Sequence, residues 1–212
     1  CESAFVGHAT VAVHLARLAT GVAKPGKVRQ KARAGIYEVD VAGTADDPKV
    51  TISIPSPPIH AAVDDDKRRK LLDVLDIDTG SLDAKCPIQV VGRNNTRLAI
   101  GLRSFDQLQQ LSPDLEALKK LTPHVGADGY FLFVRDAHGP GTVEARLFSP
   151  VLGIAEDPVS GNAYGMLGAY LAQHGLLPLK DGRASFIGYQ GRSVQRPGEL
   201  SVEVEATGGK VS

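Results

Sequence analysis

The sequence predicts an α+β fold in which the strands of each half curl around one buried helix. Two helical segments, one starting at Gly7 and the other at Gly161, are apolar nearly all round, so each is expected inside the protein rather than on its surface. Strand-like segments with turn residues between them surround each of these helices. The alternation of strands with amphipathic surface helices that a doubly wound sheet needs is largely missing.

In the first half, the helix that starts at Gly7 is stopped by Gly21 and by the Pro25–Gly26 pair. Three strands, a charged amphipathic helix and a linker follow. We place the domain boundary at this linker, which predicts an N-terminal lobe of residues 1–83 and a C-terminal lobe of residues 84–212. The strands are expected at residues 28–33, 36–41 and 50–54, the helix at 64–75 and the linker at 76–85.

The second half repeats this plan. Two short helices separate its strands, and the second of them is expected to be capped by Ser112. The second apolar helix ends at Gly175, with Pro178 close behind. The strands are expected at residues 88–91, 97–102, 130–135, 142–148, 184–188 and 200–205, and the short helices at 105–111 and 113–121.

The composition is that of an ordinary globular protein and argues against several partners. The 212 residues are 42% hydrophobic, and 24 acidic side chains balance 24 basic ones. A net charge of zero gives no electrostatic reason to bind nucleic acid or an anionic membrane, so we expect neither as a partner. No apolar run approaches the length of a membrane span and no secretory signal is visible, so a cytoplasmic location is expected.

Cysteine and histidine spacing gives no sign of a metal or a cofactor. Cys1 and Cys86 are expected to be free thiols, and Cys86 is interpreted as a small buried residue at the start of a strand. The sequence has no zinc-ligand spacing, P-loop or dinucleotide fingerprint, so we expect neither a metal site nor a cofactor.

The two apolar helices begin with similar residues. Each starts at a Gly beside short polar side chains, where free backbone N–H groups and the positive end of the helix dipole favour an anion. Asp157 and Ser160 precede the second helix, and His8 lies in the first turn of the first helix. Two such helix starts facing one cleft would form an anion pocket, which is harder to explain by capping alone.

Each of these residues also has a purely structural interpretation. Asp157 or Ser160 taken singly is more often a helix cap, and a lone His8 is more often a buried, hydrogen-bonded histidine than a catalyst. The helix dipole disfavours a charged imidazole, so His8 is expected to be neutral. The remaining histidines are interpreted as surface or turn residues; they are His14, His60, His124, His138 and His174.

Four motifs follow one another along the chain. They are Phe5-Val6-Gly7-His8-Ala9-Thr10, Arg146-Leu147-Phe148-Ser149-Pro150, Glu156-Asp157-Pro158-Val159-Ser160-Gly161-Asn162-Ala163 and Gly188-Tyr189-Gln190-Gly191-Arg192. In this order they resemble the phenazine biosynthesis PhzF-like isomerases, which have the diaminopimelate epimerase fold. The resemblance covers nearly the whole chain, and the Glu-Asp-Pro-x-Ser/Thr-Gly element is the part most specific to that family.

The resemblance implies two pseudo-symmetric lobes, each a mainly antiparallel, barrel-like sheet around a central helix, with the active site between them. It also implies a homodimer and chemistry without a cofactor. Glu2 matches the family's catalytic Glu, which lies well before the Gly-His motif. Here Glu2 almost adjoins that motif, so we expect pieces of the chain to be missing between Val6 and Gly7 and at both ends.

In the implied mechanism, Glu2 removes a proton from one carbon of a small carboxylate-bearing substrate and returns it to another. Asp157 is the second titratable group, and His8 orients the substrate or relays the proton. A carboxylate-based amino-acid racemase or epimerase and a non-catalytic small-acid-binding protein are alternatives on the same scaffold, whereas a racemase with two opposed cysteines is disfavoured. The substrate-binding residues are expected to be Gly7, Ser160, Gly161, Asn162, Gln190 and Gly191.

Overall fold

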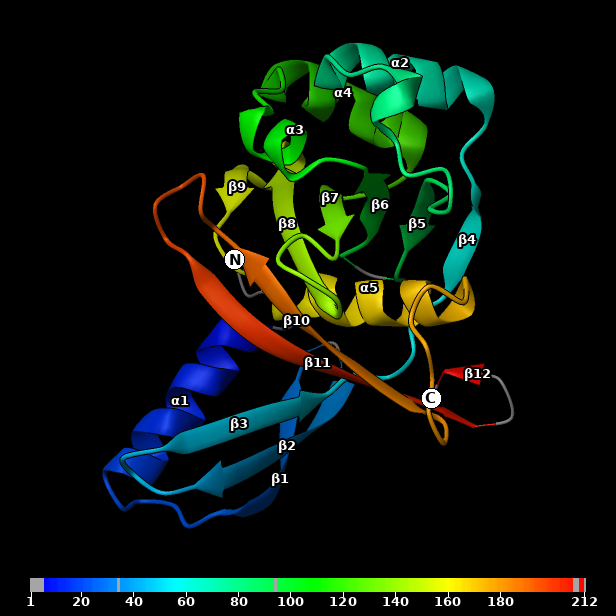
Figure 1. Ribbon diagram of the computed structural model, residues 1–212. Coiled ribbons are helices and arrows are strands. Elements are labelled where there is room, and N and C mark those ends of the chain that lie inside the picture. Colours follow the sequence, from blue (N-terminus) through cyan, green and yellow to red (C-terminus); the bar gives the residue numbers. More distant parts are fainter. Residues whose placement is uncertain (1–5, 34, 94, 208–209, 212) are drawn as a thin grey trace. The chain divides into compact units, whose positions relative to one another are not determined.

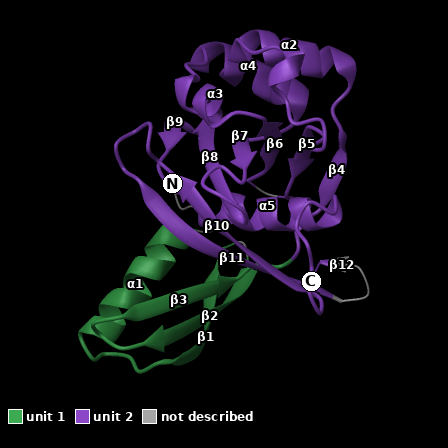
Figure 2. Ribbon diagram, viewed as in Figure 1, with its two compact units in different colours: residues 1–55 green, residues 56–212 purple. Residues whose placement is uncertain are grey.

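The computed structural model describes residues 6–33, 35–93, 95–207 and 210–211 (Figure 1). Contacts divide the chain into two compact units, Cys1–Pro55 and Ser56–Ser212 (Figure 2), whose positions relative to one another are not determined. This division falls well before residues 83 and 84, where the sequence analysis places the domain boundary. The reason is that β4 (Ile59–Ala62) pairs with a strand of the second unit and α2 (Asp65–Leu75) packs into its core.

In the first unit, one helix lies on a three-stranded antiparallel sheet. Leu18 of the helix packs against Val39 and Val41, which are buried on the inner face of the sheet. The outer face carries charged cross-strand neighbours such as Arg29 and Glu38, which suit a face in water. The elements are α1 (Gly7–Ala19), β1 (Gly26–Ala32), β2 (Gly35–Gly43) and β3 (Pro48–Ser53), with strand order β1-β2-β3.

Helix α1 is less buried than the sequence predicts. Its buried residues form one stripe of Thr10, His14 and Leu18, whereas Val13 is 54% exposed. The prediction of a helix buried all round is therefore wrong for α1, because the sheet of this unit covers only one side of it. The surface interpretation of His14 is also wrong: its Nε2 lies 3.1 Å from Oε1 of Gln30, whose Nε2 donates to Thr10 Oγ1 at 2.8 Å.

The second unit is built on one large sheet with the strand order β12-β11-β10-β8-β7-β6-β5-β4, and β9 also pairs with β8 (Figure 1). The β6–β7 and β8–β10 pairs are parallel and the other pairs are antiparallel. The remaining strands are β5 (Gln89–Val91), β6 (Arg97–Leu102), β7 (Gly129–Arg135), β8 (Thr142–Ser149), β9 (Ile154–Asp157), β10 (Arg183–Gln190), β11 (Gly198–Thr207) and β12 (Lys210–Val211).

Helix α5 (Gly161–Gln173) is the central helix of this unit. It contacts β11 and β12 at one end of the strand order and β5 and β6 towards the other end, so the sheet curls around it. The approach is close, since a Cβ on Gly188 of β10 would collide with the ring of Tyr164. The prediction of a buried apolar helix is confirmed for α5. The described strands form no closed barrel, because β12 and β4 stand at opposite ends of the order.

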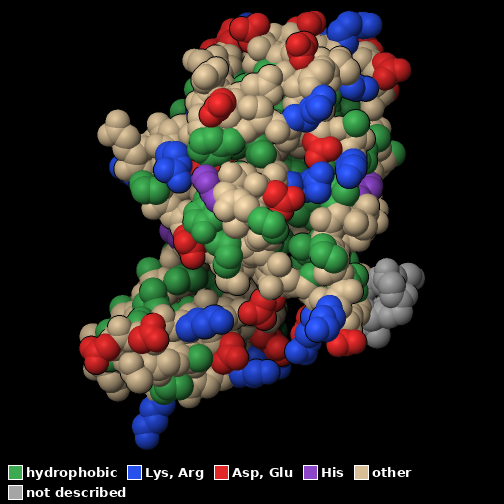
Figure 3. Space-filling view, viewed as in Figure 1, with side chains coloured by type: hydrophobic (Ala, Val, Ile, Leu, Met, Phe, Trp, Pro, Cys, Tyr) green, Lys and Arg blue, Asp and Glu red, His purple; other side chains and the backbone are tan. Residues whose placement is uncertain are grey.

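Three helices cover the other face of the sheet. Leu71 of α2, Leu108 of α3 (Phe105–Gln110) and Leu118 of α4 (Leu115–Val125) are fully buried in one core with residues of β6 and β7. Lys, Arg, Asp and Glu side chains cover the outer surface around α2 (Figure 3). The cap of α4 is Asp114, which accepts two backbone N–H groups at 3.0 Å, and not Ser112 as predicted. None of the described helices is long and apolar enough to cross a membrane.

An ion pair ties the segment before β5 to the end of β7. Arg135 donates from Nη2 and Nε to Oδ2 of Asp83 at 2.6 and 3.1 Å. Burial raises the pKa of Asp83, but these bonds and the N–H of Lys85 outweigh it, so the pKa lies below its usual value. Because folding lowers this pKa, Asp83 stabilises the protein above its unfolded pKa of about 3.9 and loses that contribution as the pH falls through the lower folded value.

We expect Asp83→Asn to remove this pH-dependent contribution. The free energy of unfolding should fall by about 1–3 kcal/mol at neutral pH, and the difference from the native chain should shrink below about pH 4. Urea unfolding at neutral pH and at about pH 3 measures both effects. Asp73→Asn, at an exposed position of α2, is the matched control. A difference that stays the same at the two pH values would show that Asp83 is not responsible.

Candidate functional site

Asp157 is the last residue of β9 and stands just before the start of α5. It lies opposite Leu147 of β8, so the sheet fixes its backbone. Its Oδ1 accepts the backbone N–H of Val159 at 3.3 Å, which turns the chain towards the helix. The carboxylate is half-buried. The Asp157 side chain therefore has a fixed position between the end of β9 and the start of α5, and the core does not enclose it.

Gln190 braces both ends of the segment from Asp157 to Ser160. The Gln190 side chain is buried at the end of β10, with 1% of the residue exposed. Its Nε2 donates to the carbonyl oxygen of Asp157 at 2.6 Å, and its Oε1 accepts the N–H of Ser160 at 3.2 Å. One side-chain amide thus satisfies two backbone groups that the turn leaves unpaired, and it fixes where α5 starts.

Two glycines let the loop after β10 approach this turn closely. Gly191 has φ +88°, and a Cβ there would collide with the carbonyl oxygens of Pro158 and Arg196. A Cβ on Gly198 would collide with Val159. Gln190 and Gly191 were expected from the family resemblance alone, and the structure places both directly against the turn that carries Asp157.

The N-terminus of α5 is partly capped and partly open. Ser160 is the N-cap, and its Oγ accepts the N–H of Ala163 at 3.4 Å. Gly161 is exposed, and a Cβ built there would meet nothing within 4 Å. The N–H groups of Gly161 and Asn162, in the first turn, point along the helix axis away from the helix body. The positive end of α5 beside Asp157 can therefore hold a carboxylate or a developing negative charge.

A buried ion pair anchors β9 from the side of the core. Arg146 donates from Nε and Nη2 to the two oxygens of Glu156 at 2.9 and 2.8 Å, and both side chains are less than 10% exposed. Its Nη1 donates to the carbonyl oxygens of Leu108 and Leu111, at the end of α3. Ser193, in the loop after β10, donates to Glu156 as well. Glu156 is therefore a structural neighbour of Asp157 and not a second catalytic carboxylate.

A second buried cation, Arg97 at the start of β6, acts on Asp157 electrostatically. Arg97 pairs with Gly129, where a Cβ would collide with Ser149 Oγ and press on the Arg97 side chain. Burial lowers the pKa of Arg97, and the carboxylates of Asp128 and Asp157 act in the opposite direction. The guanidinium stays charged at neutral pH. The Asp157 carboxylate therefore lies near a fixed positive charge, and as an anion it can accept a hydrogen bond or hold a cationic group.

The other predicted site residues belong to the first unit. His8 is exposed in the first turn of α1, and Gly7 is the first residue of that helix. The N-cap, Val6, has no side-chain capping bond, and its carbonyl oxygen accepts the N–H of Thr10 at 3.1 Å. The chain runs from Val6 directly into α1, and the expectation of missing residues before Gly7 stays a prediction. Glu2 lies outside the described residues.

The structure thus brings together the predicted site residues of the second unit: Asp157, Ser160, Gly161, Asn162, Gln190 and Gly191. Sequence reasoning missed the charged residues behind them. Arg97 opens a strand of otherwise apolar and small residues, which was the available signal for a buried charge. Arg146 and Glu156 both lie in quoted motifs, but nothing in their spacing shows that they pair.

Comparisons with known proteins identify the family of the chain. The model of the PhzC-PhzF family, described as phenazine biosynthesis-like protein, matches residues 1–212. An uncharacterized isomerase of Clostridium acetobutylicum is 35% identical over 204 residues, which are 96% of this chain and 68% of that protein. The trans-2,3-dihydro-3-hydroxyanthranilate isomerase of Pseudomonas aeruginosa is 33% identical over 127 residues, which are 59% of this chain and 42% of that enzyme.

A solved structure shows the same fold. The PhzF-family phenazine biosynthesis protein of Bacillus anthracis superposes with a TM-score of 0.84 at 20% identity, over 99% of this chain and 71% of that one. The full-length family match and the relative at 35% identity both cover the turn with Asp157 and the start of α5. The chain therefore belongs to the PhzC-PhzF family of phenazine biosynthesis-like proteins.

Proposed function

We propose that the chain is part of a cofactor-independent isomerase that moves a proton between two carbon atoms of a small carboxylate-bearing substrate. The observation that carries this proposal is the turn at the start of α5, where Asp157 is fixed by Gln190 beside open helix N–H groups. This arrangement combines a group that can bind an amine or hydroxyl with a positive helix end that can bind a carboxylate or an enolate-like charge.

In this proposal the proton transfer itself belongs to Glu2, and Asp157 and His8 position the substrate. Asp157 holds the amine or hydroxyl next to the reacting carbon, and the charge of the buried Arg97 acts on its carboxylate. His8 lies at the start of the other apolar helix and orients the substrate or relays the proton. The finer architecture, with two pseudo-symmetric barrel-like lobes and this site between them, belongs to the same proposal.

The names of two relatives support the reaction class. The Clostridium acetobutylicum relative is named an isomerase, and the Pseudomonas aeruginosa enzyme is named for the isomerisation of a hydroxyanthranilate derivative. Both names fit chemistry that needs an acid/base group and a carboxylate-binding subsite. The substrate of this chain follows from neither name, because the residues that shape a pocket differ among proteins of one fold.

A cysteine-based racemase is a poor fit to the structure. Burial raises the pKa of the Cys86 thiol to about 12, and the nearby Asp83 carboxylate acts in the same direction. A thiol must ionise to act as a base, and Cys86 is only 4% exposed. Cys86 lies before β5 and packs against Gly101 of β6, so it is a core residue. Cys1 lies outside the described residues.

A screen for hydrogen exchange tests the proposal. Amino acids, hydroxy acids and dihydroaromatic acids are incubated with the chain in D₂O, and deuterium uptake at carbon is followed by NMR and mass spectrometry. We expect at least one acid to exchange, and Glu2→Gln to slow this exchange by about 10²–10⁴-fold, the usual contribution of a general acid/base. Binding of the same acid should change little, since Gln keeps the shape of Glu.

The matched control is Glu116→Gln, an exposed carboxylate at the start of α4, which should exchange at the native rate. Equal rates for native chain and Glu2→Gln would remove Glu2 from the mechanism. If an acid bound and no carbon exchanged, a non-catalytic small-acid-binding protein would be the better description of this chain.

A further inference from the structure

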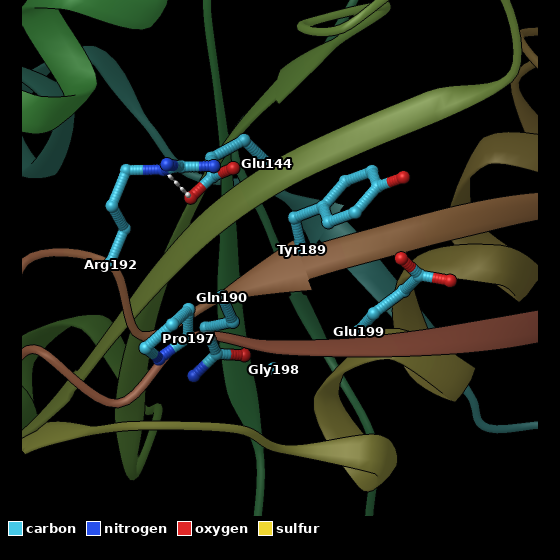
Figure 4. Close-up of a pocket in the computed structure, with 7 residues that line it drawn as sticks. All are labelled: Glu144, Tyr189, Gln190, Arg192, Pro197, Gly198 and Glu199. Atoms are coloured by element: carbon cyan, nitrogen blue, oxygen red, sulfur yellow. Dashed lines mark ion pairs between the residues drawn. The ribbon is translucent and has the colours of Figure 1, made fainter.

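A small cavity lies where β10 ends and β11 begins, beside β8. Tyr189 alternates along β10 with Gly188 and Gln190, which face α5 and the Asp157 turn, so Tyr189 points to the opposite side. The cavity has a volume of about 210 Å³ (Figure 4). It is lined by Glu144, Tyr189, Gln190, Arg192, Pro197, Gly198 and Glu199.

Two carboxylates flank one aromatic ring across this cavity. Tyr189 is the direct neighbour of Glu144 on the parallel strand β8 and of Glu199 on the antiparallel strand β11. The three side chains therefore form a row across three adjacent strands on one face of the sheet, and Figure 4 shows the Tyr189 ring between the two carboxylates. A phenol ring attracts cations to its face, and carboxylates on both sides of it add to that attraction.

Only one oxygen of the Glu144 carboxylate has a close hydrogen-bond partner. The residue is 1% exposed, and its Oε2 lies 2.8 Å from Nε2 of His138. Its Oε1 faces the cavity, where the nearest cation is Nε of Arg192 at 3.9 Å. That distance is well beyond a hydrogen bond, and the Arg192 side chain is 55% exposed. A buried carboxylate oxygen thus points into an open cavity with only a loose ion pair opposite it.

We propose that this cavity binds the primary ammonium group of a small molecule. The ammonium lies over the Tyr189 ring, donates one hydrogen bond to Oε1 of Glu144 and another to Glu199, and leaves its third donor for water. An organic cation fits better than a metal ion, because no group of three or more metal-ligating side chains is found among the described residues. The volume limits the ligand to a few heavy atoms, below the range of drug-sized pockets.

Arg192 acts as an internal competitor for this ligand. Its guanidinium occupies the position next to Oε1 of Glu144, so an incoming ammonium must displace it. Displacement is easy, because the pair is long and the side chain is mostly in solvent. Substitutions at these two residues should therefore have opposite effects. Removing the Glu144 carboxylate should weaken ammonium binding, and removing the Arg192 guanidinium should strengthen it.

The test is a titration of the chain with ethylammonium chloride, followed by the backbone amide signals of Tyr189, Glu199 and their neighbours in ¹H–¹⁵N spectra. We expect saturable shifts at this row that sodium chloride at equal ionic strength does not produce. Glu144→Gln, which still accepts the His138 hydrogen bond, should weaken binding by about tenfold or more, as expected when a charge-assisted hydrogen bond becomes neutral. Arg192→Gln should tighten it.

The same titration includes a control variant. Glu203→Gln, an exposed carboxylate farther along β11 and outside the cavity lining, should bind ethylammonium like the native chain. The proposal is wrong if the shifts follow ionic strength alone, or if Arg192→Gln weakens binding. It is also wrong if sodium acetate shifts the same amides and Arg192→Gln abolishes that effect, because the cavity would then be an anion site centred on Arg192. None of these results depends on the isomerase activity.

Discussion

Arg146→Met is expected to lower the free energy of unfolding of the second unit by about 3–5 kcal/mol, the usual cost of breaking a buried ion pair from one side. The substitution leaves the Glu156 carboxylate, 9% exposed, without the guanidinium that binds both of its oxygens. It also removes the donor to the carbonyl oxygens of Leu108 and Leu111. Methionine fills a similar volume, so the loss measures the charge and the hydrogen bonds more than a cavity.

Urea or guanidinium unfolding, followed by far-UV circular dichroism, measures this loss. The control is Arg183→Met, which removes an ion pair with Glu205 whose side chains are 76% and 62% exposed. That change should cost less than about 1 kcal/mol, because water screens a surface pair. Equal losses for the two variants would mean that the Arg146–Glu156 pair does not anchor β9.

Asp157→Asn is expected to slow hydrogen exchange into the substrate by about 10²-fold without unfolding the chain, because the substrate amine or hydroxyl loses the charge that positions it. The fold should persist, because Gln190 binds the backbone carbonyl of Asp157 and not its side chain. Asn can also accept the Val159 N–H through its own side-chain oxygen. The substitution therefore removes the negative charge and leaves the geometry of the turn.

Deuterium uptake at carbon, measured with an acid found in the screen, gives the rate, and thermal unfolding gives the stability. Asp73→Asn changes an exposed Asp of α2 in the same way and should leave both quantities unchanged. A native exchange rate in Asp157→Asn, with the fold intact, would leave Asp157 a helix-capping residue and no more.

The elements that the sequence predicted well have strong local signals. The start of α5 was placed correctly because Ser160 and Gly161 follow a proline-containing turn, and its end because Gly175, which has a positive φ, follows the C-cap His174. Most long strands were found because they combine apolar and β-branched residues between turns that contain Gly or Asn. These signals lie within a few neighbouring residues, so they can be found without knowing which distant segments come into contact.

Short edge elements escaped prediction. β4 has four residues and pairs only through an irregular register with β5, and β9 follows a short 3-10 helix, Pro150–Leu152. Such strands are stabilised by neighbours that are distant in sequence, so their own residues carry little signal. Residues distant in sequence also decide that α1 is buried on one face only. An apolar composition does not show how many sides of a helix a sheet will cover.

Polar partners in the interior were the largest gap. His138 and His174 do lie in turns, as predicted, but the sequence did not show that His138 pairs with the buried Glu144 and His174 with the buried Gln89. In the candidate site, the motif identified Asp157 and the resemblance identified Gln190, but the hydrogen bonds between them depend on the pairing of β8 with both β9 and β10. Contacts of this kind are set by strand order, which one sequence does not encode locally.

We propose that residues at the starts of α1 and α5 bind one substrate. The most direct test is an NMR titration of the chain with an acid from the exchange screen, following the amides of Gly7 and His8 together with those of Gly161 and Asn162. We expect both sets of amides to shift and to saturate with the same dissociation constant. Shifts confined to one set, or two different dissociation constants, would contradict it.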